Sequence, residues 1–111
     1  MNTFKCSICN YIVEGSDAPD KCPRCSAVKD RFVELSEDKV RLIEKSRCTN
    51  QLHMGLVSVL DQMHSIAESG IQDNLDPGCV AIFTKARDEA ARLSQFIKAE
   101  IEVHMGKGKW G

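Results

Sequence analysis

Four cysteines near the start of the chain have the spacing of a metal site. They form two Cys-x-x-Cys pairs separated by twelve residues, at Cys6, Cys9, Cys22 and Cys25. A Cys-x-x-Cys turn directs two thiolates at one ion, and two such turns supply the four sulfur ligands that iron or zinc accepts in a tetrahedron. The spacing therefore predicts a tetrathiolate metal centre. A disulfide framework is the weaker alternative, because paired Cys-x-x-Cys units favour metal where no secretory signal is expected.

The residues around the cysteines follow a second pattern. Phe4 stands two positions before the first cysteine, and Tyr11 stands two positions after the second. Further members of the pattern are Gly15, Ala18, Pro19, Pro23, Lys29 and Phe32. The pattern resembles the rubredoxin-like domain of rubrerythrins over about residues 3–35. The resemblance implies a mononuclear iron centre, Fe(Cys)4, that exchanges single electrons between its ferrous and ferric states.

Spacing alone leaves the identity of the metal open, because iron and zinc both accept four thiolates. The resemblance favours one iron per chain. Zinc is the alternative, either as a substitute for iron or as the staple of a zinc ribbon that supports a small interaction module.

Length and charge limit the possible functions. A segment of about 35 residues buries too little apolar surface to fold without a staple, and a metal supplies one. The net charge is -1, with 28% charged residues spread along the chain, which argues against a nucleic-acid partner. We expect no membrane span and no signal peptide, and therefore a cytoplasmic protein.

Residues 36–111 are predicted to form two helices, at about 37–69 and 78–105, joined by a loop at about 70–77. Ser36 is a suitable N-cap, and Gly70 is the expected C-cap. Gly55 lies within the first helix, where it marks either a close helix contact or a weak point. The expected fold is thus a small metal-bound β domain (residues 1–35) with two cysteine knuckles, followed by an all-α antiparallel hairpin (residues 36–111).

A lone hairpin would leave apolar residues uncovered on more than one side. Leu52, Leu56 and Val59 are offset around the first helix from Val57 and Leu60. We therefore expect the hairpin to form a homodimer, in which two copies complete a four-helix bundle.

The ferritin-like di-iron site of rubrerythrins is not expected here, because no Glu stands three residues before His53, His64 or His104. A different second site is a hypothesis. Across an antiparallel hairpin, Glu44 and Cys48 would lie level with Glu100 and His104, and each pair is spaced i, i+4. These groups could hold a second metal or a peroxide-reactive centre. The alternative is that solvated helix ends carry them by composition alone.

Other ligand-capable residues give weaker signals. His53 and His64 are about three turns apart and could ligate haem across a dimer, although ordinary structural histidines are commoner. Cys79 begins the second helix, where the helix dipole is expected to lower the pKa of its thiol. The glycine-rich tail around Trp110 is expected to be flexible.

Three functions follow from these features. The first is an electron-transfer protein that passes single electrons from its iron to a redox partner protein. The second is a rubrerythrin-like peroxide-scavenging oxidoreductase with a further metal centre in the helical bundle. The third is a zinc-stapled interaction module.

Overall fold

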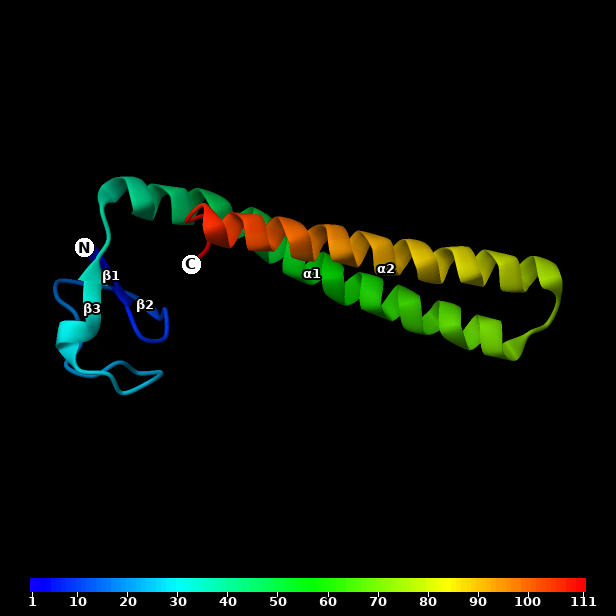
Figure 1. Ribbon diagram of the computed structural model, residues 1–111, viewed down its shortest axis with the longest axis horizontal. Coiled ribbons are helices and arrows are strands. Elements are labelled where there is room, and N and C mark those ends of the chain that lie inside the picture. Colours follow the sequence, from blue (N-terminus) through cyan, green and yellow to red (C-terminus); the bar gives the residue numbers. More distant parts are fainter. The chain divides into compact units, whose positions relative to one another are not determined.

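The computed structural model describes residues 1–111 and divides into two compact units. Residues 1–45 and Gly111 form the first unit, and residues 46–110 form the second. The first unit holds a small sheet and the opening turns of the first helix (Figure 1). The second holds the rest of that helix and all of the next one. The predicted class, a small β domain followed by a helical hairpin, is confirmed.

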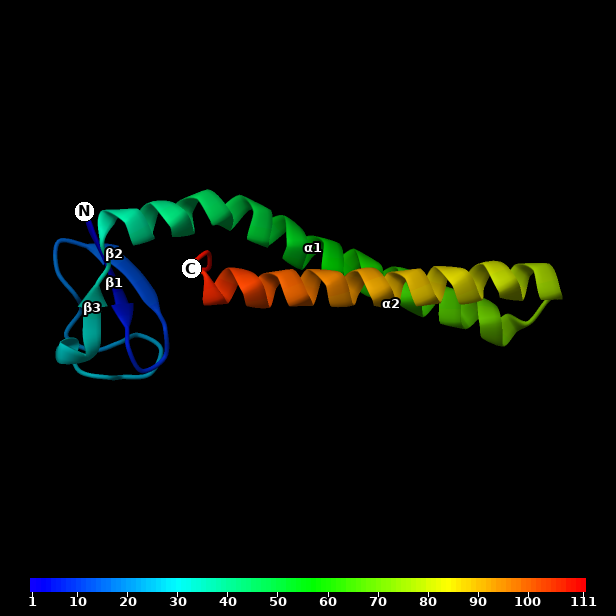
Figure 2. The same cartoon turned by 45° about the horizontal axis from the view of Figure 1, so that its top comes forward.

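The sheet has three antiparallel strands in the order β2-β1-β3. They are β1 (Asn2–Cys6), β2 (Ile12–Gly15) and β3 (Phe32–Glu34), and a single 3-10 turn, η1 (Lys29–Arg31), leads into β3. Phe4, in the central strand, pairs with Val13 on one side and Glu34 on the other. The arrangement of the strands can be followed in Figure 2.

Few side chains of this unit are buried. Cys6 ends the central strand with no exposed surface, and Cys22 is 2% exposed. Thr3 and Ile43 complete the set of buried residues. Two of the four are cysteines of the predicted metal site, so a metal bound there would take the place of a hydrophobic core, as expected for a stapled domain.

The first helix, α1 (Glu37–Asp73), starts where the sequence predicts and ends later. The Ser36 hydroxyl accepts from the Lys39 amide at 3.4 Å, which confirms Ser36 as the N-cap. The prediction that Gly70 ends the helix is wrong. The chain leaves the helix at Asn74, whose φ of 51° is left-handed, and the Asn74 amide donates to the Gly70 carbonyl at 3.3 Å.

Gly70 is needed for packing instead. A Cβ at Gly70 would come within 2.3 Å of the Phe83 ring on the second helix, so the absence of a side chain allows that ring to approach. Gly55, by contrast, has no atom within 4 Å of where its Cβ would stand. The close helix contact therefore lies at Gly70 and not at Gly55.

The second helix, α2 (Pro77–Gly106), has defined caps at both ends. Asp76 is the N-cap and accepts from the Cys79 amide at 2.7 Å, with Pro77 in the first turn. At the far end Gly108 has a φ of 74°, and the Lys109 amide donates to the His104 carbonyl at 2.8 Å. These are the features of a Schellman motif. The tail that composition predicts to be flexible is therefore folded back as an ordered turn.

The hairpin core consists of Leu60 from α1 and Ala90 and Ile97 from α2, with Val57 and Ile101 packed against them. Figures 1 and 2 both show the two helices of this unit side by side and antiparallel. Neither helix is long and apolar enough to cross a membrane.

Candidate metal centre

The two cysteine turns have the same backbone structure. In the first, the Cys6 amide donates to the Tyr11 carbonyl at 2.8 Å, and the Asn10 amide donates to the Cys6 carbonyl at 2.9 Å. In the second turn, the Cys22 amide donates to the Ala27 carbonyl, and the Ser26 amide donates to the Cys22 carbonyl, each at 2.9 Å. The residue after each turn is left-handed: Asn10 has φ 70° and Ser26 has φ 63°. The sequence thus builds two equivalent knuckles.

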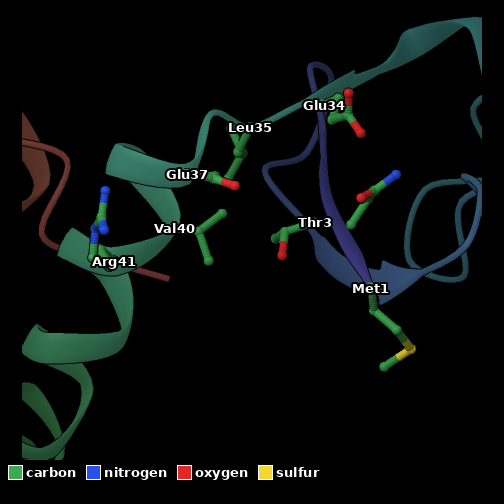
Figure 3. Close-up of a pocket in the computed structure, with 8 residues that line it drawn as sticks. Met1, Thr3, Glu34, Leu35, Glu37, Val40 and Arg41 are labelled. Carbon is green, nitrogen blue, oxygen red and sulfur yellow. The ribbon is translucent and has the colours of Figure 1, made fainter.

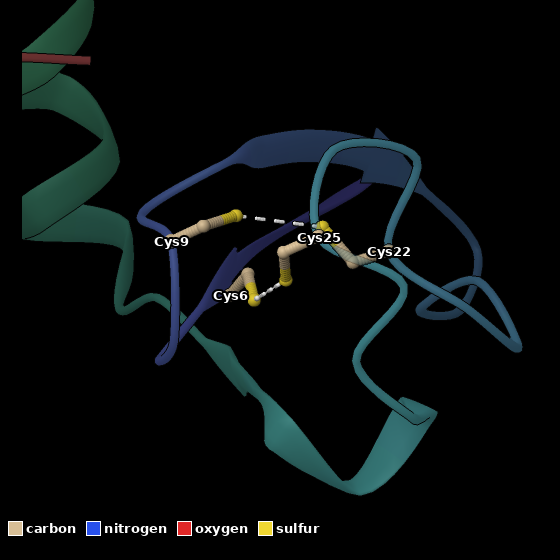
Figure 4. A group of neighbouring side chains, drawn as sticks. All are labelled: Cys6, Cys9, Cys22 and Cys25. Carbon is tan, nitrogen blue, oxygen red and sulfur yellow. Dashed lines mark hydrogen bonds between the residues drawn. The ribbon is translucent and has the colours of Figure 1, made fainter.

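The knuckles bring all four sulfurs together (Figure 4). The Sγ atoms of the four cysteines all lie within 4.8 Å of one another. Two contacts join one knuckle to the other, with the sulfurs of Cys6 and Cys25 at 3.7 Å and those of Cys9 and Cys22 at 3.5 Å. Four sulfurs at about 2.3 Å from a central ion are about 3.8 Å apart in a tetrahedron. The observed spacing therefore fits one tetrahedrally coordinated ion.

Backbone amides act on the two half-exposed sulfurs in equivalent ways. The Tyr11 amide donates to the Cys9 sulfur, and the Ala27 amide donates to the Cys25 sulfur. Such bonds stabilise the negative charge of a thiolate and are one of the means by which a protein sets the potential of a bound iron. The chain therefore offers both candidate metal ligands and backbone donors to their sulfurs.

The metal-free thiols share their protons unequally. Burial raises the pKa of Cys9, but the Tyr11 amide, the thiols of Cys22 and Cys25, and Arg24 together lower it to about 6. The Ala27 amide lowers the pKa of Cys25, but burial and the three other thiols outweigh it and raise the pKa to about 12. One thiolate thus forms easily, and a further negative charge beside it is opposed.

An ion pair between Asp17 and Lys29 joins the loop between the knuckles to η1. The carboxylate also accepts from the Ala18 amide at 2.9 Å. The pKa of Asp17 is lowered, first by the hydrogen bond from Lys29, and the pKa of Lys29 is raised by the same bond. Both groups are well exposed, so the pair contributes to loop geometry more than to stability.

A cleft of about 430 Å³ opens elsewhere on this unit (Figure 3). It is lined by Met1, Asn2, Thr3, Glu34, Leu35, Glu37, Val40 and Arg41. Arg41 is engaged with Asp38 at 2.6 Å. The lining contains none of the four cysteines and no histidine, so we assign no chemistry to this cleft.

The structure brings together only part of the second predicted site. Glu100 and His104 are adjacent, with Oε1 and Nε2 3.4 Å apart. Glu44 belongs to the first compact unit, and Cys48 is exposed on α1. The partner of His104 on α1 is Asn50, at 2.6 Å, which the sequence analysis did not single out. The only signal for Asn50 was a polar residue at a helix position that faces the core. A metal role for the four predicted residues stays a prediction.

Cys79 differs from its prediction. Its pKa is raised, first by the hydrogen bond with the Asp76 side chain, then by burial and by the charge of Asp73. The lowered pKa that the sequence predicted is therefore wrong, and the carboxylate that caps the helix is the first cause of the raised pKa. Cys48 and Cys79 are both free thiols.

Comparison with known proteins bears on the first domain. A family model described as the rubredoxin-like domain of rubrerythrin matches residues 4–33. Reverse rubrerythrin-1 of Clostridium acetobutylicum is 55% identical over 38 residues, which are 34% of this chain and 21% of that relative. The chain thus matches about a fifth of the length of the curated relative. No solved structure matches it. The predicted rubredoxin-like domain of the rubrerythrin type is confirmed, and no family model matches the helices.

Proposed function

We propose that the protein is an electron carrier whose four cysteines hold one iron and which passes single electrons to a partner oxidoreductase. The observation that carries this proposal is the placement of the four sulfurs within 4.8 Å of one another, in a domain matched by the rubrerythrin rubredoxin-like family. Iron bound by four thiolates supplies a one-electron couple. All four ligands come from the protein, which favours electron exchange over substrate binding at the metal.

The exposure of the cysteines suggests a direction for electron exchange. Cys6 and Cys22 are buried, whereas Cys9 and Cys25 are half-exposed. Ile8, inside the first knuckle, is 60% exposed and offers an apolar contact beside the Cys9 sulfur. A partner that docks over this side would come closest to the two less buried cysteines. We place the protein in a reducing, cytoplasmic compartment, because thiols that hold a metal must stay reduced.

The test is metal analysis and visible spectroscopy of the full chain purified from its native host. We expect one iron per chain, a red ferric form, and reversible bleaching by dithionite. Cys9→Ser should lose this spectrum, while Cys48→Ser, which changes an exposed cysteine outside the cluster, should keep it. Colourless protein that contains only zinc would overturn the proposal and leave the zinc-stapled interaction module.

The peroxide-scavenging alternative needs more than this domain. It requires a second metal centre in the helices. The match to the relative covers 38 residues of this chain, which is too short to include both helices. Reduction of peroxide by protein that contains the tetrathiolate iron alone would therefore not be expected.

A further inference from the structure

A second group of ligand-capable side chains lies between α1 and α2, within the unit formed by residues 46–110. His104 and Glu100 come from α2, and His53 and Asn50 come from α1. The His104 Nε2 atom is 3.4 Å from Glu100 Oε1. The ring centroids of His53 and His104 are 6.4 Å apart, and the rings meet edge to face. This group is distinct from the tetrathiolate centre and has no part in the proposed electron transfer.

Asn50 determines which nitrogen of His104 is available. Asn50 is 5% exposed, and its Nδ2 donates to the Lys109 carbonyl at 2.6 Å. The amide orientation is thereby set, and its Oδ1 faces His104 Nδ1 at 2.6 Å. An oxygen can only accept, so Nδ1 carries the hydrogen. In the neutral imidazole the lone pair is then on Nε2, the atom that faces Glu100.

This is the arrangement that metal-binding histidines require. A ligating imidazole donates its other N–H to a carbonyl or carboxylate, which holds the ring and raises its basicity. The His104 side chain is only 13% exposed, whereas Glu100 is 54% exposed and can adjust. Glu100 and His104 are spaced i, i+4, so both can reach one ion from the same face of α2.

We propose that Glu100, His104 and His53 bind a divalent transition-metal ion of the Zn²⁺ or Co²⁺ type. Two imidazoles and one carboxylate are the donor set such ions accept, with water in the remaining position. The four cysteines are the one set of three or more ligands already gathered within 4.8 Å. At the second site Glu100 and His104 form the chelating pair, and His53, whose ring centroid lies 6.4 Å from that of His104, would have to rotate to supply the third ligand.

The test is a Co²⁺ titration of the full chain, with the cysteine site already filled by one equivalent of Zn²⁺. We expect one further equivalent to bind with the weak visible bands of nitrogen and oxygen ligation. Displacement of Zn²⁺ from the cysteines would instead give intense sulfur-to-cobalt bands, so the two sites are distinguishable. Uptake of no further Co²⁺, or uptake with sulfur bands only, would overturn the proposal.

Variants locate the site. Glu100→Gln, His104→Gln and His53→Gln should each weaken Co²⁺ binding at least tenfold. The matched control is His64→Gln, because His64 and Glu68 form another i, i+4 pair on α1, at 3.9 Å, without an Asn tether. It should bind as the parent does. Glu100 is exposed, so its variant will keep the fold and remains informative if a histidine variant does not. Loss of binding in His64→Gln, or unchanged binding in Glu100→Gln, would contradict the assignment.

Discussion

Cys9 and Cys25 occupy equivalent places in the two knuckles, yet the pKa values of their metal-free thiols move in opposite directions, to about 6 and about 12. Each sulfur accepts a hydrogen bond from the backbone amide of the residue two positions later. The difference arises because the four sulfurs are too close to carry independent charges: a thiolate at Cys9 is stabilised by the remaining thiols, and the last proton is then held tightly. A bound cation removes this conflict by neutralising the thiolates together.

The first prediction concerns the pH dependence of metal binding. The metal-bound site holds thiolates, so binding displaces at least the proton of Cys25 at any pH between about 6 and about 12. The apparent affinity for Zn²⁺ should therefore rise about tenfold per pH unit for each proton displaced, and acid should release the metal. Competition with a chromophoric chelator at pH 6, 7 and 8 measures this slope. An affinity that does not change with pH would contradict it.

A second prediction concerns Cys79, whose pKa is raised chiefly by Asp76. Asp76→Asn removes the negative charge and keeps a side chain that caps helices equally well. We expect the Cys79 pKa to fall and its alkylation by iodoacetamide at pH 8 to become faster, with the helix content unchanged. The assay uses metal-loaded protein that carries Cys48→Ser. The metal protects the four clustered cysteines, so Cys79 is the thiol that reacts. Equal alkylation rates with and without the Asp76 carboxylate would show that the helix dipole or burial sets the reactivity.

At the scale of elements, two glycines in α1 have opposite roles. Both are in the helix interior, where Gly lowers stability relative to Ala. Gly55 borders open space, but Gly70 lies against the Phe83 ring, where a Cβ would stand 2.3 Å from ring carbon. The turn at Asn74 follows that contact directly. The end of α1 is therefore set by the crossing of the two helices together with the left-handed residue, and not by the first glycine that could cap it.

These two positions give a matched pair of variants. Gly55→Ala should raise the free energy of unfolding of the hairpin by about 1 kcal/mol, through helix propensity alone. Gly70→Ala should lower it by about 1 to 3 kcal/mol, because the Phe83 ring must move. Urea unfolding followed by helical circular dichroism measures both. A stabilising effect at Gly70 would mean that the ring yields at little cost, and the packing role assigned to this glycine would then be wrong.

At the scale of the whole molecule, a row of apolar side chains on α1 remains uncovered. Leu52, Leu56, Val59, Met63 and Ile66 are all exposed and follow one another at steps of four and three residues. This is the heptad spacing of helices that pack against a partner. The second helix adds exposed Ile82, Phe96 and Val103. The homodimer expected from the sequence is therefore still our proposal, with a second copy as the occupant of this row.

The corresponding prediction is a molecular mass in solution of twice 12.4 kDa by analytical ultracentrifugation. Leu56→Glu places a charge in the middle of the row and should produce monomers, because an unpaired charge is costly to bury in an interface. Gln62→Glu adds the same charge at an exposed position outside the row and should remain dimeric. A parent protein that is monomeric at high concentration, or a dimer that survives Leu56→Glu, would rule out this interface.

The clustering of the four cysteines was predictable because its determinants are local. Two cysteines three residues apart and the left-handed residue after them form a knuckle through short-range hydrogen bonds, so spacing and turn chemistry contain most of the information. The two helices were predictable for a similar reason, since apolar periodicity and the Ser36 cap act within a few turns. The sequence by itself therefore determined the four-cysteine cluster, the fold class and the start of α1.

Only the tertiary structure decided which residues meet across the hairpin. Asn50 faces His104, which is 54 positions away in the sequence, and Gly70 accommodates the ring of Phe83. The residue types asparagine and glycine do not indicate which distant residue they will contact. The raised pKa of Cys79 likewise follows from where the Asp76 carboxylate is held. Small errors in the register of two long helices change every such pairing, because side chains a turn apart face different partners. Contacts between helices are set by packing over the full length of both, and no local pattern specifies them.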